Sequence, residues 1–276
     1  MTEPLVGVPL PLDGATRVFA IVGDPIAQAG SPGLFNAAFA ARGVHAVLVP
    51  MHVSPESLSA LVAAFKATRN WDGLVITVPH KVAVAGYVDE LGVQARRTGA
   101  VNAIRKLPDG RLRGDNFDGA GFVEGLRSKQ HHLRQKRILI VGSGGAGRAV
   151  AHAVADESPS SITLYDTDMS ASEALRASVH AEHPTLTVEL GPPTAKEQDV
   201  SINCTSLGMH ADDPLPFDIS EISPSSLVVD IVLKPAMTRL LEQSAKAGAS
   251  THQGLFMLSG QISALVDFFG CGKRIR

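Results

Sequence analysis

The chain has 276 residues, of which 45% are hydrophobic and 19% charged, and its formal net charge is −2 at pH 7. This composition is typical of a globular protein, and the nearly balanced charge excludes a strongly basic nucleic-acid-binding or membrane-binding surface as its main feature. The length favours two domains of about 120 to 150 residues over one core. Two cysteines, Cys204 and Cys271, exclude a disulfide framework, and no H-E-x-x-H motif or Cys/His cluster indicates a metal site.

The N-terminal stretch MTEPLVGVPLPLDG has neither a basic region nor a continuous apolar core, so it predicts no signal peptide. No apolar run reaches the roughly 18 residues that a membrane span needs. We therefore expect a cytoplasmic protein, as a monomer or a homodimer. Its partner would be a small molecule, and neither a nucleic acid nor a membrane.

In the first half of the chain, short apolar runs alternate with longer amphipathic stretches. The runs predict strands at residues 17–23, 46–53, 73–79 and 100–107. The stretches between them predict helices at Pro32–Arg42 and Pro55–Thr68, each opened by a Ser-Pro pair.

The second half repeats this alternation. Strands are predicted at 137–142, 161–166, 199–205 and 227–232, and helices at about 145–156, 170–182 and 237–248. Such alternation is typical of βαβ units, so the sequence predicts an α/β fold with largely parallel sheets.

The domain boundary is expected near residues 119–136, where a helical stretch leads into the basic segment SKQHHLRQKR (128–137). We interpret that segment as a solvated linker, with an anion site as the alternative. The apolar segment 254–270 has helical spacing and is long enough to pack back onto another element. The predicted domains are residues 1–118, rejoined by 254–276, and residues 119–253.

The stretch ILIVGSGGAGRAVAHAVA (138–155) places Gly142, Gly144 and Gly147 in G-x-G-x-x-G spacing, directly after a strand and opening a helix. This context provides a tight turn, a close backbone approach to a pyrophosphate, and a helix N-terminus with free N–H groups. The loop therefore predicts a dinucleotide site that also includes Gly145 and Ala146. The alternative is a glycine-rich turn without a ligand.

Asp166 ends the following strand, 24 residues after Gly142. A carboxylate there can accept hydrogen bonds from a ribose 2′-hydroxyl and would repel a 2′-phosphate. Because Thr167, Asp168 and Met169 follow and no arginine does, the sequence favours NAD over NADP, with NADP as the alternative cofactor. Otherwise Asp166 would only cap the coming helix.

Eight segments together resemble the shikimate/quinate dehydrogenase family, from about residue 17 to residue 270. They are VGDPIAQAGSPGLFNAAF, GLVITVPHK, GAVNAI, GDNFDGAGF, VGSGGAGRAV, INCTSLGM, VVDIVLKPAMTRLL and GLFMLSGQ. Each is unspecific alone, but their order and spacing match the family.

The resemblance implies a substrate domain and a Rossmann domain. It also implies reduction of 3-dehydroshikimate with a nicotinamide cofactor, or oxidation of shikimate or quinate. Lys81 and Asp118 match the catalytic pair of the family. The implied substrate-binding residues are Ser31, Thr77, Asn102 and Gln261, and further implied cofactor contacts are Thr205, Leu207 and Gly254.

The chemistry suits these two residues. Hydride transfer to a ketone builds negative charge on oxygen, which a lysine ammonium can stabilise while it delivers the proton. Burial would lower the lysine pKa and a neighbouring carboxylate would raise it; the sequence favours neither effect. The competing interpretations are an ordinary helix-start lysine and a turn-forming aspartate.

Besides Leu233, which stands where a tyrosine usually follows DIV in the family, three positions depart from the family pattern around the substrate. The family usually has H-S-x-S-P where this chain has QAGSP, so Gln28 and Ala29 replace a histidine and a carboxylate-binding serine. Phe117 replaces the usual threonine next to Asp118. Losing one hydroxyl contact to a charged group costs roughly 1.5–3 kcal/mol, or about ten- to a hundredfold in affinity.

The sequence therefore predicts a divergent NAD(P)-dependent dehydrogenase for shikimate- or quinate-type cyclic hydroxy acids. One alternative is a dehydrogenase for a different hydroxy or amino analogue. A second is a dinucleotide-binding regulator without turnover, against which the presence of both Lys81 and Asp118 argues.

Overall fold

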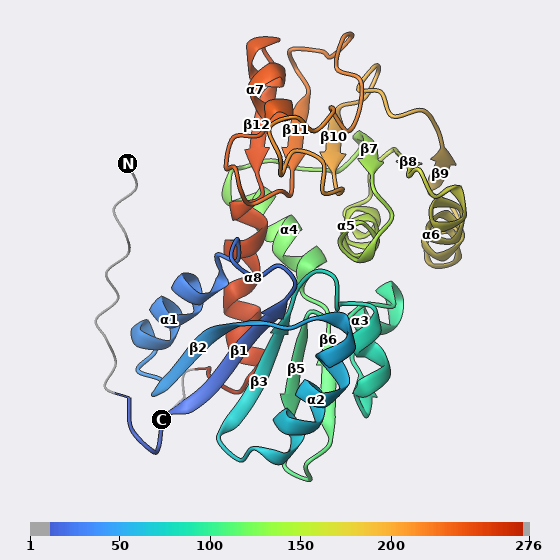
Figure 1. Cartoon of the computed structure of the whole chain (residues 1–276). Coiled ribbons are helices and arrows are strands. Elements are labelled where there is room, and N and C mark those ends of the chain that lie inside the picture. The colour runs from blue at the N-terminus through green and yellow to red at the C-terminus, as the bar shows by residue number, and fades with distance from the viewer. Residues whose placement is uncertain (1–11, 273–276) are drawn as a thin grey trace. The chain divides into compact units, whose positions relative to one another are not determined.

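The computed structural model describes residues 12–272, and the chain divides into two compact units (Figure 1). The first unit contains the chain up to Phe117 and from Gln261 onward, and the second is Asp118–Gly260. No helix among the described residues is long and apolar enough to cross a membrane.

The first unit is built on a six-stranded sheet in the order β2-β1-β3-β5-β6-β4. The strands are β1 (Arg17–Gly23), β2 (Ala46–His52), β3 (Trp71–Ile76), β4 (Glu90–Leu91), β5 (Ala103–Lys106) and β6 (Leu112–Asp115). Strands β2, β1 and β3 are parallel as predicted, but β5 is antiparallel to both β3 and β6. Strands β4 and β6 are again parallel, so this sheet is mixed, and the expectation of largely parallel sheets holds only in part for this unit. Strands β5 and β6 are antiparallel because a tight connection follows β5, where Gly110 (φ +85°) lets the chain turn back on itself.

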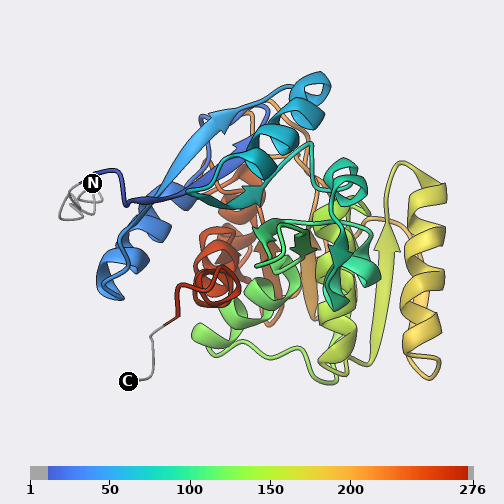
Figure 2. The ribbon, with the colours of Figure 1, turned by 90° about the horizontal axis from the view of Figure 1, so that it is seen from below.

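Helical segments cover both faces of this sheet. They are α1 (Ser31–Ala41), η1 (Pro55–Ser57), α2 (Leu58–Ala67), η2 (Ala83–Tyr87) and α3 (Val93–Thr98). Along β1, Phe19 and Ile21 face a core with Phe35 and Phe39 of α1, whereas Ala20 and Val22 face a second core that contains residues of α2. Figure 2 shows α1 and α2 on opposite sides of these strands. The alternation follows from the two-residue side-chain period of a strand.

The second unit contains a fully parallel sheet in the order β12-β11-β10-β7-β8-β9. Its strands are β7 (Arg137–Val141), β8 (Ser161–Tyr165), β9 (Thr187–Leu190), β10 (Val200–Asn203), β11 (Leu227–Asp230) and β12 (Ser250–Gln253). The chain runs outward from β7 to β9, then returns to β10 on the other side of β7. This is the Rossmann strand order, with its switch point between β7 and β10. The predicted α/β class with a Rossmann domain is confirmed.

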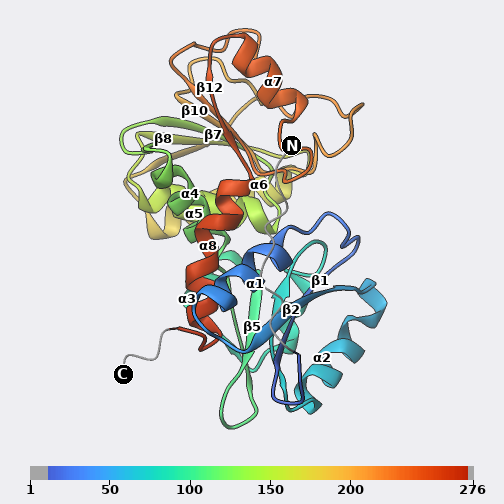
Figure 3. The ribbon, with the colours of Figure 1, turned by 90° about the vertical axis from the view of Figure 1, so that its left-hand side faces the viewer.

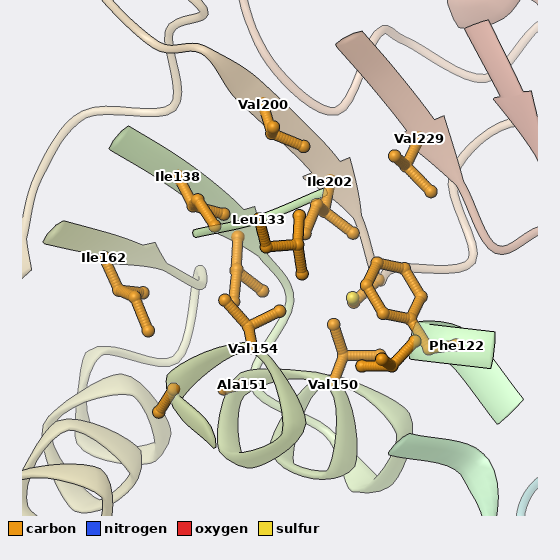
Figure 4. Packing of buried hydrophobic residues seen from close by; sticks show 14 of the residues in the cluster. Phe122, Leu133, Ile138, Val150, Ala151, Val154, Ile162, Val200, Ile202 and Val229 are labelled. Atoms are coloured by element: carbon orange, nitrogen blue, oxygen red, sulfur yellow. The ribbon is translucent and has the colours of Figure 1, made fainter. Parts of the chain in front are cut away.

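Helices also cover both faces of the second sheet. They are α4 (Asp118–Ser128), α5 (Gly145–Asp156), α6 (Met169–Glu182), α7 (Arg239–Lys246) and the first residues of α8 (Leu255–Phe268). In Figure 4, Ile138, Ile162 and Ile202 meet the side chains of α5 and Phe122 of α4. On the opposite face, Leu139 and Val228 pack with the leucines of α7, which Figure 3 shows on the other side of the strands from α4 and α5.

Helix α8 contributes to both cores. Near its start, Met257 belongs to the core of the second unit. In the first unit, Ile262, Leu265, Val266 and Phe269 pack against the phenylalanines of β1 and α1. Arg105 Nη1 donates to Phe268 O at 2.8 Å, and Arg17 Nη2 donates to Phe269 O at 3.1 Å. These cations also complement the negative end of the helix dipole.

Candidate active site

In the first unit, the candidate site begins where the parallel strands β1 and β3 end side by side. Thr77 follows β3 directly, and its N–H donates to Val22 O at 2.9 Å. A Cβ placed on Gly23 would collide with the Thr77 methyl group and would lie 3.0 Å from Val78 O. Glycine at the end of β1 therefore lets the two strand ends meet. The loop that carries Ala29 and the start of α1, Ser31, follow β1 at this same edge.

Lys81 lies in the loop between β3 and η2, and this loop is fixed on both sides. The neighbouring His80 is 1% exposed, and its Nε2 is 2.7 Å from Val53 O. The carbonyl of Lys81 accepts a hydrogen bond of 2.8 Å from Val101 N, just before Asn102. The half-buried Lys81 side chain therefore starts from a backbone with little freedom.

Asn102 is the centre of the polar contacts in this unit. Its side chain is buried at 2% exposure, and its Nδ2 donates to Gln261 Oε1 at 2.9 Å. Its Oδ1 accepts from Phe117 N at 2.9 Å, which fixes the orientation of the amide. Asn102 thus joins the segments GAVNAI, GDNFDGAGF and GLFMLSGQ, although Gln261 is 159 residues away in the chain.

The two acids of the segment DNFD have different positions. Asp115 Oδ1 accepts from Ala95 N and Asn116 N, both at 2.9 Å, so its carboxylate satisfies a backbone N–H in the first turn of α3. Asp118 is the first residue of α4 and is 3% exposed. Lys81 belongs to the first unit and Asp118 to the second.

Two of the departures from the family pattern, Ala29 and Phe117, pack against the apolar core around Phe35. The Phe117 ring lies 5.2 Å from the Phe268 ring, centroid to centroid, at a tilt of 58°. Gln28, the third departure, bonds to its own loop through Nε2 and Pro25 O at 2.8 Å. The side of this site that begins at β1 is therefore more apolar than the family pattern would make it.

In the second unit, the glycine-rich turn has the geometry that a dinucleotide needs. Gly142 has φ +105°, a region that glycine occupies without strain. A Cβ on Gly147 would collide with Gly142 O, whereas a Cβ on Gly144 would meet nothing within 4 Å. Helix α5 thus starts at Gly145 and packs closely on β7, leaving open space beside Gly144. Gly145 and Ala146 form its first turn, where free N–H groups can bind phosphate.

Asp166 faces this turn and does not cap the next helix. Its Oδ2 accepts from Ser143 N at 2.6 Å and its Oδ1 accepts from Asp168 N at 2.9 Å. The N-cap residue of α6 is Asp168, whose Oδ1 accepts from Ser170 N and Ala171 N. The alternative of Asp166 as a simple cap is therefore wrong, and a carboxylate has lone pairs left for a further donor.

Three other predicted residues of the second unit follow its central strands. Thr205 and Leu207 lie in the loop after β10, and a Cβ on Gly142 would be 3.0 Å from Thr205 N. Gly254 follows β12, and a Cβ there would lie 2.5 Å from Ile231 O, after β11. All these positions are at the carboxyl ends of parallel strands on both sides of the switch point, where ligands of open α/β sheets bind.

Sequence reasoning missed Asn203 and Asp230, the last residues of β10 and β11. Both are completely buried and hydrogen-bonded to each other. A polar residue that ends a strand of apolar residues was the available signal. Among the residues that the structure describes, no group of three or more His, Cys, Asp or Glu side chains could hold a metal ion.

Residues 21–104 match the family model of the shikimate dehydrogenase substrate-binding domain. Over 256 residues the chain is 37% identical to the shikimate dehydrogenase (NADP+) of Rhodospirillum rubrum. That alignment covers 91% of this chain and 90% of the relative.

Solved structures with the same fold include dehydrogenases with different names. A shikimate dehydrogenase from Aquifex aeolicus has a TM-score of 0.85 at 30% identity, covering 95% of each chain. A 5-ketofructose reductase of Gluconobacter has a TM-score of 0.81 at 28% identity, covering 93% of this chain and 94% of that one. A quinate dehydrogenase from Corynebacterium glutamicum, in complex with NAD, has a TM-score of 0.82 at 26% identity, covering 94% and 95%.

Proposed function

Because the chain belongs to the shikimate dehydrogenase family of NAD(P)-dependent oxidoreductases, we propose that it interconverts a cyclic hydroxy acid of the shikimate or quinate type and its 3-dehydro ketone. The single observation that carries this proposal is the Asn102–Gln261 hydrogen bond of 2.9 Å. It unites two expected substrate-binding residues from distant segments next to the Lys81 loop. In this proposal the first unit binds the substrate and the second binds the dinucleotide.

Lys81 is the proposed general acid and base. When the ketone is reduced, a hydride reaches the carbonyl carbon and Lys81 gives its proton to the oxygen; in the reverse direction Lys81 takes the hydroxyl proton as the hydride leaves carbon. The nicotinamide cofactor, when bound, is the partner that gives or takes the hydride. Asp118 is the proposed partner acid of this catalytic pair, and Ser31, Thr77, Asn102 and Gln261 are the residues proposed to hold the ring substituents.

The second candidate is a dehydrogenase for an analogue with a less polar or smaller anionic group. Its support is the apolar surroundings of Ala29 and Phe117, which pack against the core around Phe35. A protein with the same fold at 28% identity is named 5-ketofructose reductase, which also supports a substrate other than shikimate or quinate.

A screen of purified protein tests both candidates. NADH and NADPH formation would be followed with shikimate, quinate, their amino analogues and open-chain polyols. Turnover of shikimate or quinate with the highest kcat/KM supports the first candidate, and a clear preference for another compound supports the second. Dinucleotide binding without turnover of any compound would favour a regulator.

For the cofactor, we propose NAD in preference to NADP. The support is the Asp166 carboxylate, which lies within hydrogen-bond distance of Ser143 in the glycine-rich turn. The Rhodospirillum relative is named for NADP+, whereas the quinate dehydrogenase structure contains NAD. Among the described residues, Arg148 is the basic residue whose side chain donates to the glycine-rich turn, with its Nε 3.3 Å from Ser143 O.

Titration of both oxidised cofactors into wild type and Asp166→Ala tests this preference. We expect the wild type to bind NAD more tightly than NADP. Asp166→Ala should bring the two dissociation constants closer together, because it weakens NAD binding and relieves the repulsion of the 2′-phosphate of NADP. Equal dissociation constants in the wild type would reject the NAD preference. Arg148→Ala tests the alternative that Arg148 binds the 2′-phosphate of NADP. In that case the substitution would raise the Kd for NADP and leave the Kd for NAD unchanged.

A further inference from the structure

The loop after β10 is held by a buried polar pair that no expected ligand contact requires. Asn203 and Asp230 are direct neighbours in the parallel pairing of β10 and β11, and both side chains are 0% exposed. Asn203 Nδ2 donates to Asp230 Oδ1 at 3.0 Å. A carboxylate buried at this depth is costly unless it is fully hydrogen-bonded, so its presence needs a reason.

Asn203 uses its whole amide on the loop and on Asp230. Its Oδ1 accepts from Thr205 N at 3.0 Å and from Thr205 Oγ1 at 2.7 Å, while its Nδ2 also donates to Leu207 O at 2.9 Å. Thr205 Oγ1 in turn accepts from Leu207 N at 3.0 Å. One side chain thereby fixes the loop at both Thr205 and Leu207.

Asp230 fixes Asn203 from the other side. Its Oδ1 accepts from Val232 N at 3.0 Å, and its Oδ2 accepts from Thr238 Oγ1 at 2.7 Å. Thr238 is the N-cap residue of α7, where it also accepts from Leu241 N. The carboxylate therefore ties β10, β11 and the start of α7 to one point, and it permits only one orientation of the Asn203 amide.

The loop held in this way lies against the glycine-rich turn. A Cβ on Gly142 would be 2.8 Å from both the carbonyl carbon and the oxygen of Cys204, so the two backbones are in contact. We propose that Asn203 and Asp230 are positioning residues, which hold residues 204–208 against Gly142 in the one conformation that receives the dinucleotide. This inference rests on the proposed function, because it takes Thr205 and Leu207 as cofactor contacts.

The test compares dinucleotide affinity with thermal stability in four variants. Asn203→Ala removes the contacts to the loop, and Asp230→Ala removes the acceptors of Asn203 Nδ2 and Thr238 Oγ1 while it leaves the contacts between Asn203 and the loop available. Thr238→Ser keeps the hydroxyl. Val229→Ala is the matched control, because it destabilises the same strand β11 from the core side without touching the loop.

For Asn203→Ala and Asp230→Ala we expect the Kd for NAD+ or NADP+ to rise at least about tenfold, which corresponds to about 1.4 kcal/mol. Thr238→Ser should bind like the wild type, and Val229→Ala should lose Tm without a comparable loss of affinity. Equal dissociation constants for Asp230→Ala and Val229→Ala at matched Tm would overturn the positioning role. A wild type that binds neither dinucleotide would instead reject the proposed function.

Discussion

At the scale of single residues, Asn102 illustrates how a buried amide can organise a polar site. It offers a donor and an acceptor, and the described contacts use both, toward Gln261 and toward Phe117 N. A carboxylate at this position would lack the donor and add a charge. The segments that carry Gln261 and Phe117 are thus held by a residue whose loss would leave a hydrogen-bonding group of these contacts unsatisfied.

The clearest residue-scale prediction concerns Lys81. Lys81→Ala should lower kcat by roughly 10²- to 10⁴-fold, the usual contribution of a general acid. The Kd for the dinucleotide should not change, because the glycine-rich turn belongs to the other unit. Lys66→Ala is the charge-matched control, since Lys66 is half-exposed and pairs with Asp89 at 3.2 Å in the same unit. More than about a tenth of wild-type turnover in Lys81→Ala would exclude the assigned role.

A second residue-scale prediction concerns Ala29 and Phe117. Ala29→Ser restores a hydroxyl toward the substrate carboxylate, so kcat/KM for shikimate should rise by roughly ten- to a hundredfold if that hydroxyl limits the wild type. Phe117→Thr should behave differently, because the ring packs on Phe268. Its loss should cost roughly 2–4 kcal/mol of unfolding free energy, in addition to any gain in activity.

The measurement is kcat/KM for shikimate and quinate, with Tm, for both single variants and the double variant, whose effects need not add. Phe117→Leu controls for the cavity, since it keeps apolar volume but provides no hydroxyl. A wild type already efficient on shikimate, or an Ala29→Ser variant no better than the parent, would mean that other contacts replace the missing serine. The protein would then be an ordinary family member at this site.

At the scale of elements, periodicity located the long apolar strands and the longer helices within a few residues. It missed β4, β6, β9, β12 and α3, which have two to six residues each. Such elements are too short to establish a period, and their formation depends on neighbours. Strand β6, for example, exists because the chain turns back on β5 and pairs Gly114 with Ile104. The same dependence concealed the Asn203–Asp230 pair, whose partners are adjacent only once β10 and β11 are aligned.

The junction between β12 and α8 carries a pH-dependent weakness. His252 is 3% exposed, and its Nδ1 is buried without a hydrogen-bond partner among the described residues. Its ring lies 5.5 Å from that of His131 and 4.9 Å from that of Phe256, centroid to centroid. Burial, together with the charges of His131 and Lys129, lowers the pKa of His252 from its ordinary 6.5 to about 4.

Because the folded state resists protonation of His252 while the unfolded chain does not, stability should be unaffected above pH 6.5 and should fall as the pH drops from 6.5 towards 4. A shift of this size corresponds to ~3 kcal/mol at the acid end. Thermal unfolding between pH 4 and 7 should therefore show a flatter profile for His252→Leu than for the wild type. His210→Leu, at an exposed position, should leave the profile unchanged. Parallel profiles for His252→Leu and the wild type would exclude His252 as the cause.

At the scale of the whole molecule, the two units differ in how the chain builds them. The second unit is one continuous segment, Asp118–Gly260, whereas the first needs residues from both ends of the chain. Composition and length favour two domains, and the glycine-rich turn identifies the dinucleotide-binding one. The boundary between the two units falls inside α8, between Gly260 and Gln261. The sequence does not reveal this boundary, because the apolar pattern of the helix continues from the residues of one core to those of the other.

This difference predicts the effect of removing residues 261–276. The first unit would lose Ile262, Leu265, Val266 and Phe269 from its core, each worth about 1.5–3 kcal/mol. Their sum, roughly 6–12 kcal/mol, is comparable with the whole stability of a domain, so the first unit should unfold. The second unit keeps Met257 and its complete sheet, and should still bind the dinucleotide with a Kd near that of the full chain.

Hydrogen exchange measured by mass spectrometry would show loss of protection in β1, β2 and β3 but not in β7, β8 and β10. A chain lacking only residues 273–276 is the control. Retained protection of β1 in the longer truncation would show that the first unit does not need residues 261–276. Loss of dinucleotide binding would show that the two units do not fold as separate cores.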